Sequence, residues 1–219
     1  MRVNRLLHVV RPPAAPPDGE GDDQRLVAGL RSGEAWAGGE LVKRYGSLVR
    51  RILFRVFGTD DSEQADLAQE IFTRAWQGVG QLSDARALKA WLTRIAVFTA
   101  RGAIRQRRRR RWLSFFDNLP ETMPEPATAW AGPDLRDAAS CVYRIFDRLP
   151  VDERLPYALR VMGGLDLDET ADACGMSLST VRRRLAKAER RFFKLARQYE
   201  ALGPWLDAEP GDGGREGEA

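Results

Sequence analysis

The stretch from Leu167 to Arg191, LDETADACGMSLSTVRRRLAKAERR, decides the fold of the C-terminal part of this chain. A helix-turn-helix requires a small residue where its two helices cross, and Ala171 meets this requirement. Four residues later the tight turn requires a residue that tolerates a positive φ angle, and Gly175 is suited to it. Ser177 is placed to cap the second helix, and Val181 is placed as its buried anchor. The spacing therefore predicts a helix-turn-helix.

The predicted second helix is amphipathic, with an apolar seam of residues spaced three and four apart. The seam consists of Leu178, Val181, Leu185, Ala188, Phe192 and Leu195. The other faces are basic or small and polar, and the first turns of such a helix reach base edges in the major groove. The candidate DNA contacts on this helix are Ser179, Thr180, Arg182, Arg183 and Lys187. An arginine can bond guanine in a bidentate way, whereas Lys187 is better placed for phosphate. The alternative is a solvated basic face on a core helix.

Charge is strongly segregated along the 219 residues, although the net charge is only +4. Residues 101–111 hold seven arginines and no acid, and residues 182–197 hold eight basic residues and one acid. These two stretches contain 15 of the 35 basic residues and 1 of the 31 acidic ones, so the remainder is acidic. Two separate basic surfaces on an acidic protein suit a polyanion, and nucleic acid is the obvious candidate.

Several classes of protein are excluded by composition. No apolar run approaches the roughly 20 residues of a membrane span, so no membrane insertion is expected. The apolar residues 6–10 are too few for a secretory signal. Cys141 and Cys174 lack metal-ligand spacing, and the single His8 lies close to the N-terminus. We therefore expect a reduced, cytoplasmic protein with no metal site, no cofactor and no catalytic residues.

The order of patterns along the chain predicts an all-α fold of two small helical domains. Helical periodicity covers residues 22–111 and 138–199, and no segment alternates apolar and polar residues over the length of a strand. Between them, residues 112–137 are acidic and contain four prolines, which predicts a linker. The Pro-rich residues 1–21 and the acidic residues 200–219 are predicted to be disordered.

The last helix of the first domain, predicted from Ala85 to Arg111, carries a basic stripe. Its members recur at spacings of four, three and four, and the helix continues into a polybasic end. The candidate DNA contacts on this helix are Arg94, Phe98, Arg101, Arg105 and Arg108. Cations can follow phosphates while an aromatic ring stacks on an unpaired base, as binding to single-stranded DNA requires. The alternative for Phe98 is a place in the core.

Three motifs in this order resemble the extracytoplasmic-function (ECF) sigma factors of bacterial RNA polymerase. They are DLAQEIFTRAW at Asp66–Trp76, AWLTRIA at Ala90–Ala96 and STVRRRLAKA at Ser179–Ala188. The resemblance implies that the first domain binds core RNA polymerase and opens the minus-ten element of promoter DNA. It implies that the second domain reads the minus-thirty-five element, without catalytic chemistry, and it makes an anti-sigma partner plausible. The chain departs from the family pattern at Phe98 and Gly102, where polar residues are usual.

The first of these motifs supplies a candidate polymerase-binding face. Leu67 and Ile71 are expected to face inward, and the opposite face is polar and acidic. The candidate polymerase contacts are Asp66, Gln69, Glu70 and Thr73.

Two other functions compete with this interpretation. A stand-alone helix-turn-helix regulator would explain the second domain but would leave the Asp66–Trp76 motif and the basic stripe without a role. An RNA-processing enzyme is disfavoured because the sequence has no metal cluster, Gly-rich phosphate loop or nucleophile constellation.

Overall fold

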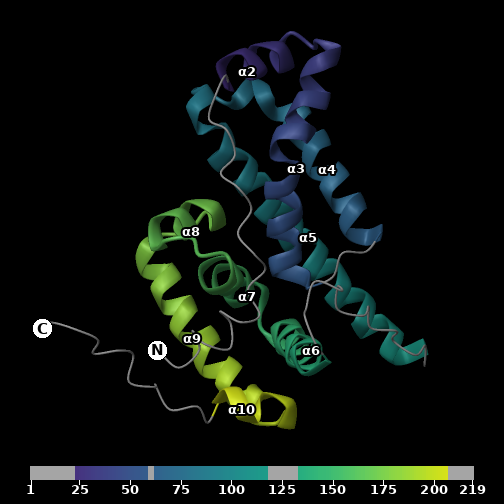
Figure 1. Ribbon diagram of the computed structural model, residues 1–219, viewed down its shortest axis with the longest axis vertical. Helices are drawn as coiled ribbons and strands as arrows, with labels where there is room; N and C mark the ends of the chain where they lie inside the picture. The colour runs from purple at the N-terminus through teal and green to yellow at the C-terminus, as the bar shows by residue number, and fades with distance from the viewer. Residues whose placement is uncertain (1–22, 59–61, 118–132, 207–219) are drawn as a thin grey trace, which may run out of the picture.

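The computed structural model describes residues 23–58, 62–117 and 133–206, and every regular element in these ranges is helical (Figure 1). The predicted all-α fold is therefore confirmed. The elements are α2 (Asp23–Arg31), α3 (Ala35–Phe57), α4 (Ser62–Gly78), η1 (Val79–Gln81), η2 (Ala85–Ala87), α5 (Leu88–Asp117), α6 (Pro133–Arg148), α7 (Val151–Tyr157), η3 (Ala158–Met162), α8 (Leu167–Cys174), α9 (Leu178–Ala196), η4 (Glu200–Leu202) and α10 (Gly203–Leu206). We call α2–α5 the N-terminal half and α6–α10 the C-terminal half.

The N-terminal half is a bundle of α3, α4 and α5, with α2 lying across one end (Figure 1). Its centre consists of apolar residues that recur every three or four positions, such as Val49, Ile52 and Leu53 of α3 and Ile71 of α4. The α3 helix ends at Gly58, which adopts a φ of +79° and donates its N–H to the carbonyl of Phe54 at 2.7 Å. A glycine is favoured there because this left-handed conformation strains other residues.

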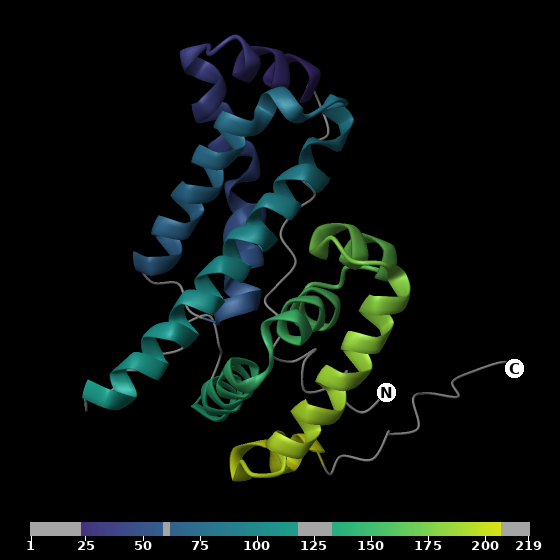
Figure 2. The same ribbon diagram turned by 180° about the vertical axis from the view of Figure 1, so that it is seen from behind.

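The two halves pack against each other, and their buried apolar residues form one continuous hydrophobic cluster. The α5 helix contacts α7 and α8, and α3 contacts η3 (Figures 1 and 2). Aromatic residues of the C-terminal half, among them Phe146 and Phe192, continue the core that begins in α3. We call this packing of one half on the other the closed arrangement.

Two helix boundaries differ from the sequence predictions. The α5 helix runs to Asp117, six residues past its predicted end, because the first helix-breaking proline in this stretch is Pro120. The α6 helix already begins at Pro133, since proline is well tolerated in the first turn.

The predicted disorder of residues 200–219 is wrong for residues 200–206, which form η4 and α10. The buried side chain of Leu202 holds them against the core. The expectations for residues 1–21, 118–132 and 207–219 lie outside the described residues. In the part of the chain that the structure describes, no helix is both long enough and apolar enough to cross a bilayer.

Candidate nucleic-acid interface

The helix-turn-helix is formed by α8 and α9, and its sequence signals act as predicted. Gly175 makes the turn with a φ of +62° and donates its N–H to the carbonyl of Asp172 at 3.1 Å. The Ser177 hydroxyl accepts the N–H of Thr180 at 3.3 Å, which caps α9. Ala171 is buried where the helices cross, and Val181 is fully buried as the anchor.

A capping box at the start of α8 adds to this local order. The Asp166 carboxylate accepts the N–H of Glu169 at 2.7 Å, and the Glu169 carboxylate accepts the N–H of Asp166 at 2.8 Å. Two backbone donors that the helix leaves unpaired are thereby satisfied. The α8 helix has only eight residues, so these bonds fix where it begins and how it presents α9.

The α9 helix exposes the predicted DNA contacts on one side. Ser179, Arg182, Arg183 and Lys187 are exposed, and Thr180 is half-buried. Val181, Ala188 and Phe192 of the predicted seam are buried, and Leu185 and Leu195 are half-buried. Leu178 was also predicted to belong to the buried seam, but its side chain is 38% exposed. It is the first residue of α9 and lies beyond the edge of the core.

The basic stripe of α5 is also on the surface. Arg94, Phe98 and Arg105 are exposed, whereas Arg101 is half-buried. The Phe98 side chain is 63% exposed, so the alternative that placed it in the core is wrong. Its ring lies 5.6 Å from the guanidinium carbon of Arg74 on α4, a cation–π contact that holds the ring at the surface.

Three arginines of α5 contact the C-terminal half in the closed arrangement. Arg101 donates to the carbonyl of Cys174 at 3.1 Å, at the end of α8. Arg108 donates to the carbonyls of Asp147 and Leu149, at the end of α6. Arg94 lies 3.8 Å from the carboxylate of Asp172 in an exposed ion pair.

The ends of α6 and α8 carry unpaired carbonyls and a partial negative charge, so guanidinium groups are favoured there. Part of the predicted DNA surface of α5 is thus occupied by protein backbone. Neither the spacing nor the composition of α5 indicates this second role of the arginines.

A second set of contacts joins α3 to the C-terminal half, and sequence reasoning missed these residues too. Arg154 donates to the carbonyl of Val56 at 2.7 Å and pairs with Asp147. Its guanidinium carbon lies 5.6 Å from the centre of the Phe57 ring, and that of Arg107 lies 4.4 Å from the same ring. Burial lowers the pKa of Arg154, and the Asp147 carboxylate opposes this effect.

Tyr143 completes this contact at the end of α3. Its hydroxyl donates to the carbonyl of Phe54 at 3.2 Å, and its ring lies against Gly58, where an added Cβ would come within 2.3 Å. Gly58 is therefore required both for its φ angle and for the approach of the other half. The two residues are 85 positions apart, and no local sequence pattern indicates that they meet.

The candidate polymerase face on α4 has the predicted geometry. Leu67 and Ile71 are buried, and the opposite face of α4 is exposed. That exposed face carries Asp66, Gln69, Glu70 and Thr73. The Glu70 carboxylate accepts two bonds from Arg74, at 2.9 and 2.6 Å. The face is thus polar and locally ordered.

Each half of the chain matches the model of a known protein family. Residues 41–110 match Sigma-70 region 2, and residues 139–192 match Sigma-70, region 4. The first match covers most of α3, all of α4 and most of α5, and the second runs from within α6 to most of α9. Together they define the class of protein, which is the sigma-70 type of RNA polymerase subunit.

Similarity to individual proteins indicates a narrower family within this class. The chain is 30% identical over 175 residues to the RNA polymerase sigma factor CnrH of Cupriavidus metallidurans, covering 77% of this chain and 91% of CnrH. It is 29% identical over 176 residues to the ECF RNA polymerase sigma-E factor of Escherichia coli K12, covering 76% of this chain and 90% of that relative. The solved structure of CnrH in complex with the cytosolic domain of CnrY aligns with a TM-score of 0.55 and 26% identity, over 80% of this chain and 97% of that one.

This chain belongs to the ECF sigma factors, which are non-enzymatic subunits that direct RNA polymerase to promoters. The resemblance inferred from the three sequence motifs is confirmed.

Proposed function

We propose that the exposed basic face of α9 reads the minus-thirty-five element in the major groove. The observation that carries this proposal is the position of Arg182 and Arg183, exposed in the first turns of a helix that a cap and a buried anchor hold in place. Side chains at the start of a recognition helix reach base edges, and arginine can bond guanine through two donors. Lys187 lies further along α9 and is assigned to phosphate.

We assign the minus-ten element to α5 and polymerase docking to α4. Arg94, Phe98, Arg101, Arg105 and Arg108 would follow one strand of melted DNA, with the exposed Phe98 ring stacking on a base. The acidic face of α4 would dock on a basic surface of the polymerase. These assignments place residues 22–111 at the minus-ten element and residues 138–199 at the minus-thirty-five element, joined by a linker over residues 112–137.

The closed arrangement restricts this function, because Arg101 and Arg108 are bonded to carbonyls of the C-terminal half. A guanidinium group that donates to a backbone carbonyl cannot donate the same N–H to a phosphate. We propose that the two halves separate when the chain acts on polymerase, and that phosphate oxygens then replace the carbonyls. Bonds between two charged groups are stronger than bonds to a neutral carbonyl, so the exchange favours the DNA-bound state.

Reconstitution with core RNA polymerase tests these assignments, because Arg105 and Lys89 are both exposed cations of α5 but only Arg105 lies on the stripe. Arg105→Ala should slow strand opening at promoters that the intact chain uses, while Lys89→Ala should not. On a template with a pre-melted bubble the two variants should initiate equally well. Equal opening rates on duplex promoters would contradict the assignment of the stripe to DNA.

An anti-sigma partner is proposed on the basis of the relatives, since CnrH was solved with the cytosolic domain of CnrY. The expected finding is a protein from the same cells that binds this chain and lowers promoter-directed transcription in the reconstituted system. A chain that is fully active when isolated from those cells, with nothing bound, would contradict this proposal.

A further inference from the structure

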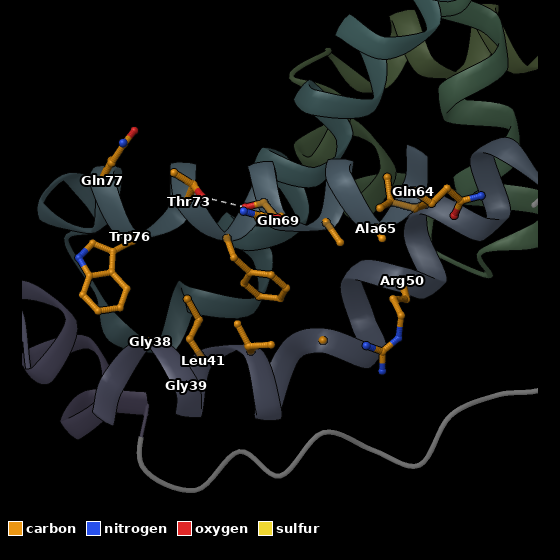
Figure 3. A pocket seen from close by; sticks show the side chains of 15 residues that line it. Gly38, Gly39, Leu41, Arg50, Gln64, Ala65, Gln69, Thr73, Trp76 and Gln77 are labelled. Carbon is orange, nitrogen blue, oxygen red and sulfur yellow. Dashed lines mark hydrogen bonds between the residues drawn. The ribbon is translucent and has the colours of Figure 1, made fainter. Parts of the chain in front are cut away.

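An open apolar groove of about 710 Å³ runs between α3 and α4 (Figure 3). Its floor is formed by Leu41, Val42, Leu53, Ala65, Ala68, Phe72 and Trp76. Val42 and Trp76 are 46% and 39% exposed, which is unusual for large apolar side chains. Contiguous exposed apolar surface of this kind marks a binding site.

The groove exists because the α3 wall contains three glycines, Gly38, Gly39 and Gly46. A Cβ at Gly38 would lie 1.9 Å from a ring carbon of Trp76, and a Cβ at Gly39 would meet nothing within 4 Å. Glycine inside a helix is destabilising, so packing within the bundle does not account for all three. An occupant that approaches the α3 backbone closely would account for them.

The rim of the groove is polar, and an acidic surface adjoins it. Figure 3 shows Trp76 at one end and Arg50 at the other, with Gln69 and Thr73 along the α4 side. Asp66 and Glu70 lie on the exposed face of α4 next to these two wall residues. An occupant with an apolar face and basic flanks therefore fits this part of the rim.

The first residues of the chain, which lie outside the described part, have this chemistry. Val3, Leu6, Leu7 and Val10 follow the spacing i, i+3, i+4 and i+7, by which an amphipathic helix enters a groove. The same stretch contains Arg2, Arg5 and Arg11, and the first acid of the sequence is Asp18. Pro12 and Pro13 would end such a helix.

The connection to the described chain is long enough. Asp23 accepts bonds from the Tyr45 hydroxyl at 2.9 and 2.8 Å, and Tyr45 directly precedes Gly46 of the groove wall. Residues 11–22, which are rich in proline, span about 37 Å at about 3.1 Å per residue. The α3 wall from Gly38 to Leu53 is about 22 Å long, and a helix is about 10–12 Å wide with its side chains.

We propose that Val3–Val10 of this chain binds in the groove between α3 and α4 as a short amphipathic helix. Its four apolar residues lie on the floor, and its arginines lie toward Asp66 and Glu70. This proposal rests on the groove, the acidic surface beside it and the N-terminal sequence, and it concerns the chain free of polymerase.

Protection of a cysteine in the groove measures the occupancy in the full chain. Ala65→Cys places a small thiol on the floor, and Ala186→Cys on α9 is an exposed control. The native Cys141 and Cys174 give little background, because both are buried and burial raises the pKa of both thiols, that of Cys174 to about 11. A maleimide with a bulky group should modify the Ala65→Cys thiol slowly in the intact chain.

Breaking the anchors should remove this protection. Leu6→Asp with Leu7→Asp should speed modification of the groove thiol about tenfold, as expected if the tether gives about 1 mM effective concentration and the segment alone binds at about 0.1 mM. Ala14→Asp with Ala15→Asp adds the same charge outside the anchors and should leave the slow rate unchanged. Modification of the Ala186→Cys thiol should be equal in all three backgrounds.

Three results would overturn the proposal. The first is an equal rate for the groove thiol with and without the Leu6 and Leu7 substitutions. The second is protection that disappears on dilution, which would assign the groove to a second copy of the chain. The third is protection that appears only when core polymerase is added, which would assign the groove to polymerase.

Discussion

Phe98 is an apolar residue that the fold leaves at the surface. Its 63% exposure and its contact with Arg74 explain how an aromatic ring can stand among arginines without belonging to the core. Truncation of a buried phenylalanine costs about 3–5 kcal/mol, whereas truncation at an exposed site costs little. The stability of a Phe98 variant therefore separates a structural role from a DNA-binding role.

We predict that Phe98→Ala leaves the melting temperature nearly unchanged and impairs strand opening by the holoenzyme. Opening is measured by permanganate reactivity of thymines in the minus-ten element. A stacked ring contributes about 1–3 kcal/mol per base. A large fall in melting temperature, with unchanged opening of duplex promoters at temperatures where the variant is folded, would count against stacking.

The basic residues of α9 should divide into two groups. Arg182→Ala or Arg183→Ala should cost about 1–3 kcal/mol in discrimination among minus-thirty-five sequences, because a bidentate bond to guanine is lost. Lys187→Ala should weaken binding to all sequences alike and reduce the salt dependence, since a phosphate contact is lost. The measurement is holoenzyme affinity for a set of promoter variants at several salt concentrations. Equal losses on every sequence would show that Arg182 and Arg183 contact only phosphate.

At the scale of single elements, α4 combines a buried face with an exposed acidic one. We predict that Glu70→Lys weakens core polymerase binding, because reversing a rim charge slows association across an electrostatic interface. The fold should survive, since the exposed Glu70–Arg74 pair contributes only about 0.2–0.5 kcal/mol. Asp137→Lys reverses another exposed negative charge, on α6, and is the control. Unchanged affinity in a kinetic binding assay, with unchanged circular dichroism, would refute the polymerase face.

The α8 helix should depend on its capping box. Asp166→Ala removes a side-chain acceptor at the start of an eight-residue helix and should lower the free energy of unfolding by about 1 kcal/mol. Asp168→Ala changes an acid in the same first turn that makes no cap, and should cost less. Urea unfolding of both variants gives the comparison, and equal losses would show that the cap contributes nothing of its own.

Local signals explain why most elements could be predicted from the sequence. Gly175 and Ser177 act within a turn of their own position, so their neighbours in the sequence reveal their role. The Phe98 ring could not be assigned, because spacing alone places it at the edge between the buried and exposed faces of α5. The same limit applies to the groove, which depends on how α3 and α4 meet.

At the scale of the whole molecule, the main feature that could not be predicted is the closed arrangement. Arg101 and the Cys174 carbonyl are 73 residues apart, and Arg154 and the Val56 carbonyl are 98 apart. No periodicity or motif encodes such pairs, because they depend on how two finished helical units pack. The arginines of α5 predicted a polyanion partner. In this structure two of them, Arg101 and Arg108, instead donate to backbone carbonyls at the ends of α8 and α6.

The central claim is that α5 arginines exchange these carbonyls for promoter DNA, and the distance between the halves tests it most directly. Fluorescent dyes on Ala90→Cys in α5 and Asp168→Cys in α8, both exposed positions, report this distance by energy transfer. We predict high transfer in the free chain and a marked fall in the complex with core polymerase and promoter DNA. Transfer that stays high in a complex that is actively transcribing would contradict the account.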